Sequence, residues 1–308
     1  MTTGPRTEAR AEQAHRQRTH ATVAGEMVRL AWVRWRRLLI PVALAANLAL
    51  VLHTVYQLGI RYGGPTDWIF IWQPAASQLA AGTLYSGPTG VFVWSPLAAW
   101  LLAHVVLPLG YPVLVAAHFA ALLALRNRHL ALLVAISWPF WVDLVPGNFF
   151  VFVAISGFLA LRGSRLAALA FFALCMLMPR PVQFPLAVWL LWHDRALVLP
   201  VAAMATASIG IVGLTGYGDD WIRTMITIGR DYPYRAWDLG PSRILGAWWL
   251  LVGIPLGVWL TLKGRVGLAG LAVSPYLVPQ YLLMLLIELP SGREGRLGAE
   301  ASRDPLAP

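Results

Sequence analysis

Long apolar stretches separated by short polar segments run through most of the chain. A helix needs about 20 apolar residues to cross the roughly 30 Å hydrocarbon layer of a membrane. No sustained alternation of apolar and polar residues predicts strands. We therefore predict an all-α, polytopic bundle of about 9–10 transmembrane helices. The predicted spans lie near 38–59, 91–125, 130–145, 149–161, 165–178, 181–193, 196–215, 244–262 and 266–288.

Several of these predicted spans are short, and several contain proline. A stretch of about 13 or 14 residues is short for a single crossing. Proline in a membrane helix is tolerated where neighbouring helices or a cavity satisfy the freed carbonyl groups. The prolines in question are Pro139, Pro185, Pro255 and Pro275. This pattern favours a protein that lines a cavity over a simple membrane anchor.

The composition agrees with a membrane protein and excludes an ordinary soluble one. Hydrophobic residues make up 58% of the chain and charged residues 12%, whereas soluble domains have about 25% charged residues. The net charge of +10 suggests loops beside an anionic membrane rather than nucleic-acid binding. Arginine dominates the basic residues, with Lys263 as the single lysine, which suggests a bacterial source. Cys175 is the single cysteine, so we expect neither a disulfide framework nor a cysteine metal cluster.

The distribution of basic residues predicts the orientation of the loops, because loops rich in Lys and Arg face the cytoplasm. We expect residues 1–37 to form a basic cytoplasmic tail, 38–289 the transmembrane domain and 290–308 a disordered tail. The first apolar run shows no cleavage site, so we expect a retained helix. The loops 60–90, 145–148, 178–181 and 216–243 are then extracytoplasmic.

That orientation depends on the segment 91–125, which must cross the membrane an odd number of times. A break at Pro108-Leu109-Gly110-Tyr111-Pro112 could divide the segment into two crossings. The charge pattern favours one crossing. We therefore interpret the break as a kink or a re-entrant turn.

Asp67 is the most informative residue of the first outer loop. It follows the turn-rich stretch Gly63-Gly64-Pro65-Thr66 and precedes an apolar run that begins at Trp68. A carboxylate at such a position is partly desolvated, which raises its pKa and suits a general base. Taken alone, the residue is better explained as the N-cap of the helix that follows.

Other ionisable residues have two explanations each. Asp143 is either a second catalytic acid or a cap at the end of a span, and we expect His53, His104 and His118 to make polar contacts between helices. Asp219 and Asp220 are adjacent, so their carboxylates point apart on a helix, and no His or Cys lies nearby. We expect no metal ion and no cofactor.

Motifs in order along the chain resemble glycosyltransferase family 87. The first comprises Asp67, an aromatic pair, the small-residue stretch that ends in Leu79-Ala80-Ala81-Gly82 with Tyr85 three residues later, and Trp94-Ser95-Pro96. Gly147-Asn148 is similar to a Gly-Gln-x-Asn stretch that lacks its Gln. Met178-Pro179-Arg180-Pro181 is similar to a Lys-x-Pro element with Arg for Lys. Ser274-Pro275-Tyr276 with Gln280-Tyr281 is similar to a late Ser-Pro element. The resemblance spans about residues 40–285.

The resemblance implies a GT-C-type bundle in a bacterial plasma membrane, with the N-terminus in the cytoplasm. It implies transfer of a mannosyl or similar residue from a polyprenyl-phosphate sugar to a glycolipid or envelope glycan. Asp67 would be the catalytic base. The implied donor-phosphate ligands are Arg180, Arg230 and Arg235, and the implied acceptor or sugar ligands are Trp72, Tyr85, Asn148 and Tyr276.

For the arginines, simpler explanations stay open. Arg180 lies near the end of a span and could extend to the membrane interface, and Arg230 and Arg235 could pair with Asp231 and Asp238 in a solvated loop. Two other functions also stay open. Broken helices and charges near spans are typical of lipid or solute transporters and flippases. A non-catalytic membrane subunit in envelope assembly is the third alternative.

Overall fold

The computed structural model describes residues 35, 37, 39–85, 92–230, 238–240 and 242–289. Throughout those residues every regular element is a helix and no strand occurs. This agrees with the predicted all-α class. The chain divides into two compact units, one up to Leu52 and one from His53 onward.

The described part of the first unit is apolar helix. It belongs to the helix Leu39–Ile60, which has 22 residues. At 1.5 Å per residue such a helix is about 33 Å long, enough to cross a bilayer. Leu39, Leu48 and Leu52 are all more than half exposed. An apolar surface of this extent is stable in lipid and not in water, which supports the prediction of a first transmembrane helix here.

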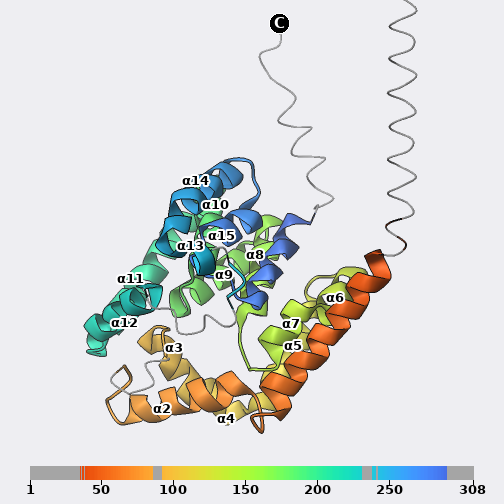
Figure 1. Ribbon diagram of the computed structural model, residues 1–308. Helices are drawn as coiled ribbons and strands as arrows, with labels where there is room; N and C mark the ends of the chain where they lie inside the picture. Colours follow the sequence, from red (N-terminus) through yellow and green to blue (C-terminus); the bar gives the residue numbers. More distant parts are fainter. Residues whose placement is uncertain are drawn as a thin grey trace, which may run out of the picture. The chain divides into compact units, whose positions relative to one another are not determined.

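The second unit is built from many short helices (Figure 1). Their bounds are η1 Val55–Ile60, η2 Trp68–Trp72, α2 Gln73–Ala80, α3 Pro96–Leu101, η3 Leu102–Val106, α4 Leu107–Leu109, α5 Tyr111–Leu123, α6 Arg128–Ile136, α7 Trp138–Leu144, α8 Phe150–Leu161, α9 Arg165–Leu177, η4 Pro181–Gln183, α10 Phe184–His193, η5 Arg195–Leu197, α11 Val198–Leu214, α12 Gly218–Arg230, α13 Ser242–Leu245, η7 Gly246–Trp248, α14 Trp249–Leu262, α15 Val266–Val273 and η8 Pro279–Glu288. Of these, η1, η2 and η3 are π-helical, and η4, η5, η7 and η8 are 3₁₀-helical.

Two described helices, Leu39–Ile60 and Arg195–Leu214, are long and apolar enough to cross a membrane alone. The number rises to three if the bent pair Pro96–Leu109 and Tyr111–Leu123 forms one span. The helices α8, α9 and α14 are apolar but shorter. A membrane protein of a few spans is therefore supported, and the larger number of spans stays a prediction.

The predicted break in 91–125 is confirmed, and the number of membrane crossings in this segment stays a prediction. The two helices of this segment meet at 98° at Gly110, whose φ of 85° is accessible to glycine at little cost. Other predicted spans are also divided, with proline at the start of the second helix. Pro139 lies in the first turn of α7 and Pro185 in that of α10. Proline suits this position because the first-turn N–H groups have no helical partner.

The core of the second unit is centred on α8, which is buried along most of its length. It packs against α9 and η8, and Figure 1 shows α9 beside it. A second cluster of buried side chains forms around Trp72 and Trp94. The two clusters bring residues 68–102 and the late part of the chain into one folded unit.

Close helix contacts in this unit depend on glycine. A Cβ atom at Gly270 of α15 would overlap the carbonyl oxygen of Val182 in η4. Small residues permit such approaches of one backbone to another in membrane proteins. The contact holds η4, and with it the neighbouring Arg180, against α15.

We predict that Gly270→Ala lowers the free energy of unfolding by about 1–3 kcal/mol, because backbone atoms must move to admit the methyl group. Gly213→Ala in α11 is the matched control, because its added Cβ meets no atom within 4 Å. Thermal unfolding in detergent micelles compares the two variants. Equal melting temperatures for both would contradict the packing argument.

Candidate active site

A cavity of about 550 Å³ opens among six segments of the chain. They are the segment 57–71, residues 93–94, the end of α7 with the loop after it, the turn 179–181, Met225 of α12 and the segment 275–281. Of the residues that the sequence predicts, Asp67, Asn148, Arg180 and Tyr276 line it. Apolar side chains cover most of the wall, and a few polar groups converge on it, which is typical of ligand sites.

Asp67 reaches the cavity from the turn before η2. Gly63 and Gly64 have φ values of 76° and 155°, which glycine adopts readily. The N–H of Trp68 then donates to the carbonyl of Pro146 at 3.0 Å and fixes the turn against the loop after α7. Although Asp67 stands at the N-cap position, its side chain accepts no capping hydrogen bond. The N-cap explanation is therefore wrong, and the carboxylate is directed to other partners.

Asn148 connects the predicted base to the predicted cation. Its Nδ2 donates to Asp67 Oδ2 at 3.2 Å, and its Oδ1 accepts from Arg180 Nη2 at 3.1 Å. The N–H of Phe149 also donates to this Oδ1, at 3.0 Å. Because the carboxylate only accepts and the guanidinium only donates, these partners allow one orientation of the amide.

Arg180 lies in extended backbone between α9 and η4, with only 8% of the residue exposed. Its guanidinium carbon is 5.3 Å from the ring centre of Phe150, 5.5 Å from that of Tyr281 and 5.9 Å from that of Trp94. Aromatic faces attract a cation at such distances. The backbone N–H of Arg180 donates to Gln183 Oε1 at 2.9 Å. The cation is therefore buried and held at the cavity wall by these contacts.

The burial of Asp67 changes its acidity. Desolvation raises the pKa of this carboxyl group from 3.8 to about 7. The positive charge of Arg180 acts in the opposite direction, and the negative charge of Asp143 adds to the increase. A carboxyl group with this pKa exchanges a proton near neutral pH, which is what a general base requires.

Asp143 anchors the loop that carries Asn148. Its two carboxylate oxygens accept from the N–H groups of Phe150 and Val151 at 2.9 and 2.7 Å, and its backbone carbonyl accepts from the N–H of Asn148 at 2.8 Å. Asp143 thus caps the start of α8, one of the two roles predicted for it.

His118 supports this cap from α5. Its Nε2 lies 3.4 Å from Asp143 Oδ2, and both side chains are fully buried. Its Nδ1 lies 2.8 Å from the carbonyl oxygen of Leu114 and must carry the proton, because a carbonyl can only accept. The Nε2 contact does not meet hydrogen-bond geometry. The contact between helices predicted for His118 is present, whereas the Nδ1 of His104 contacts the Trp100 carbonyl of its own helix.

Two predicted ligands lie behind the cavity wall. Trp72 is fully buried, with its ring centre 4.6 Å from that of Trp94 and 4.4 Å from that of Phe149. Tyr85 donates its hydroxyl to the backbone carbonyl of Trp94 at 2.6 Å. Neither lines the cavity. Both position Trp94, which does line it.

Arg230 ends α12, and its side chain is outside the described part of the structure, as is all of Arg235. Trp94 and Tyr281 line the cavity beside Arg180, although the sequence assigned them no role. Both residues occur in the motifs quoted above, and this was the signal in the sequence that could have pointed to them. Within the described residues, no three His, Cys, Asp or Glu side chains are grouped to hold a metal ion.

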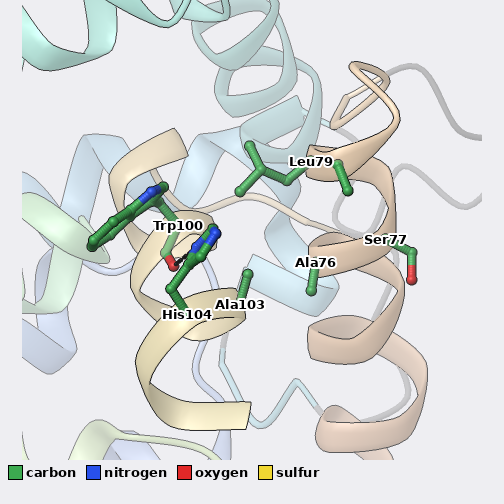
Figure 2. A pocket seen from close by; sticks show the side chains of 7 residues that line it. Ala76, Ser77, Leu79, Trp100, Ala103 and His104 are labelled. Carbon is green, nitrogen blue, oxygen red and sulfur yellow. Dashed lines mark hydrogen bonds between the residues drawn. The ribbon is translucent and has the colours of Figure 1, made fainter. Parts of the chain in front are cut away.

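A second hollow, of about 480 Å³, lies between α2 and the α3–η3 helix. Figure 2 shows that Trp100 and His104 lie on one side of it and Ala76 and Leu79 on the other. The His104 ring stacks on Trp100, and its Nδ1 lies 2.9 Å from the Trp100 carbonyl oxygen. This hollow has no carboxylate or guanidinium in its lining, so the first cavity is the better candidate site.

The described residues define an all-α protein with candidate membrane spans and a half-buried cavity that carries one carboxylate and one guanidinium. No protein-family model, curated protein or solved structure matches the chain.

The raised pKa of Asp67 predicts an unusual pH dependence of stability. The native state favours the protonated carboxyl group. The contribution of this group to the free energy of unfolding is therefore complete below pH 3.8 and is lost as the pH rises to about 7. Asp67→Asn cannot ionise. We therefore expect this variant to melt at a higher temperature than the wild type at pH 8 and to lose that advantage toward pH 4.

Asp194→Asn is the control, because its expected effect on the melting temperature at neutral pH is opposite to that of Asp67→Asn. A hydrogen bond from Arg165 lowers the pKa of the partly exposed Asp194, so this substitution removes a small stabilisation at neutral pH. Melting curves between pH 4 and pH 8 measure both. An Asp67→Asn variant that is less stable than the wild type at pH 8 would contradict the desolvation of Asp67.

Proposed function

We propose that the protein is a membrane glycosyltransferase. It moves a mannosyl or similar residue from a polyprenyl-phosphate sugar to a glycolipid or envelope glycan on the extracytoplasmic face of a bacterial plasma membrane. One observation carries the proposal. A carboxylate of raised pKa and a buried guanidinium, from distant segments, bind the same asparagine at one cavity. The order of the motifs that resemble glycosyltransferase family 87 agrees with this pairing.

The reaction needs one base and one cation. In a single displacement, Asp67 takes the proton of an acceptor hydroxyl as the hydroxyl oxygen forms a bond to the anomeric carbon. The bond from that carbon to the phosphate oxygen breaks, and the electron pair leaves with the lipid phosphate. The attack from the opposite side inverts the configuration, so a β-linked donor gives an α-linked product.

Arg180 is suited to the leaving group. A sugar phosphodiester carries one negative charge, which the one guanidinium on the described cavity wall balances. Guanidinium groups also match phosphate oxygens in geometry. In an apolar surrounding the attraction between the two charges is stronger than in water. The charge that develops on the phosphate as the bond breaks is therefore stabilised where it forms.

Asn148 has a supporting part in this mechanism. Its side chain already binds Asp67, Arg180 and the N–H of Phe149, so it sets the distance between base and cation instead of serving mainly as a sugar ligand. Tyr276, Tyr281 and Trp94 supply aromatic surface on the same wall. Aromatic faces of this kind pack against the apolar faces of a bound molecule.

We predict that Asp67→Asn lowers sugar transfer by about 10²–10⁴-fold, the usual contribution of a general base. The assay uses purified protein in lipid vesicles, radiolabelled polyprenyl-phosphate mannose and a membrane glycolipid extract. Asp219→Asn is the matched control, because Asp219 is an exposed carboxylate of α12 outside the cavity lining. It should keep the wild-type rate.

Two outcomes of this assay would overturn the proposal. Equal product from the wild type and Asp67→Asn would exclude Asp67 as the base. Movement of the labelled lipid across the vesicle membrane without any product would favour a transporter or flippase.

The rate should also depend on pH in a defined direction. Since the base acts only when it is ionised, kcat/KM should rise about tenfold per pH unit below pH 7 and level off above it. The same assay from pH 5 to pH 9 measures the profile. A flat profile across pH 7, with chemistry rate-limiting, would be inconsistent with Asp67 as the titrating base.

A further inference from the structure

The helix α12 (Gly218–Arg230) separates its apolar and polar residues more sharply than its neighbours do. At 100° per residue, the apolar side chains occupy one half of the helix circumference and the polar ones the other. Trp221, Ile222, Met225 and Ile226 lie on the apolar half, and Asp219, Asp220, Arg223, Thr224 and Thr227 lie on the polar half. Such a division requires an apolar surrounding along one half of the helix.

The protein itself provides only part of that surrounding. Trp221 donates its indole N–H to the Val93 carbonyl at 3.2 Å, and Met225 lines the cavity that holds Asp67 and Arg180. One helical turn apart on the remaining apolar edge, Ile222 is 55% exposed and Ile226 is 66% exposed. The apolar half of α12 is therefore divided between the cavity wall and an uncovered strip.

The uncovered strip continues a surface that is suited to lipid. The helix Arg195–Leu214, whose second part is α11, is one of the two described helices able to cross a membrane alone. Its end is strongly apolar and uncovered, with Leu214 89% exposed. A short turn through Gly216, with φ of 73°, leads directly into α12. The strip therefore begins where a membrane-crossing helix would leave the hydrocarbon layer.

We infer that α12 is an interfacial helix that binds the lipid bilayer surface through Ile222 and Ile226. Amphipathic helices of this kind lie in the plane of the membrane, with the apolar face about 5–10 Å into the boundary between headgroups and acyl chains. The exposed Asp220 and Arg223 then face water. Because Met225 belongs to the same helix, this contact brings one wall of the cavity to the level of the lipid phosphates.

This placement does not depend on the proposed chemistry, and its test uses neither substrate nor turnover. With Cys175→Ala, the chain has no native cysteine. A single cysteine is then introduced as Ile222→Cys, Ile226→Cys, Arg223→Cys or Thr227→Cys, and each variant carries a nitroxide spin label. The protein is reconstituted in vesicles of phosphatidylcholine and phosphatidylglycerol. The collision rates of each label with oxygen and with a water-soluble nickel chelate give its depth.

Labels at 222 and 226 are expected to lie about 5–10 Å below the phosphates, with collisions dominated by oxygen. Labels at 223 and 227 are expected to collide mainly with the nickel chelate. Ile222 and Ile226 are tested separately, so failure of one variant to fold leaves the other to decide.

Three outcomes would overturn the inference. Water exposure at all four positions would place α12 outside the membrane. Labels at 222 and 226 that reach neither oxygen nor nickel would indicate that protein covers the strip. Spin–spin broadening confined to those two labels would identify a second copy of this chain as the occupant.

Discussion

The hydrogen bonds of Asn148 are the constraint on which the candidate site depends. A polar group removed from water costs free energy unless it finds a partner, and a charged one costs more. Asp67 accepts a hydrogen bond from the Asn148 amide nitrogen, and Arg180 donates one to the Asn148 amide oxygen. The amide can therefore be oriented in only one way. Since the three residues come from separate segments, this network ties the turn before η2, the start of α8 and the end of α9 to one point.

The surroundings of that network determine its chemistry. The apolar wall weakens hydration, and desolvation of Asp67 outweighs the attraction of Arg180. Burial therefore raises the pKa of Asp67 to about 7, although the Arg180 guanidinium is close by. Asp143 accepts two backbone hydrogen bonds at the start of α8, and the His118 ring lies beside it with both side chains fully buried. In the apolar interior, such contacts are strong when complete and costly when one partner is lost.

The broken helices have a physical reason in this arrangement. Backbone that lines a cavity or is buried in protein can leave helical geometry at membrane depth, because its polar groups find partners there. The turns at 144–149 and 178–181 both leave helical geometry, and both carry residues of the network.

The sequence by itself determined the all-α class, the first apolar helix and the bend at Gly110, because hydropathy, glycine and proline act locally. The order of the motifs also selected Asn148, Arg180 and Tyr276, which the fold brings to one cavity. Only the tertiary structure decided that Asp67 is not a helix cap and that Trp72 and Tyr85 do not line the cavity. It alone also gave Trp94 and Tyr281 a place beside Arg180. These facts depend on side-chain direction and on contacts between distant segments, which no local pattern encodes.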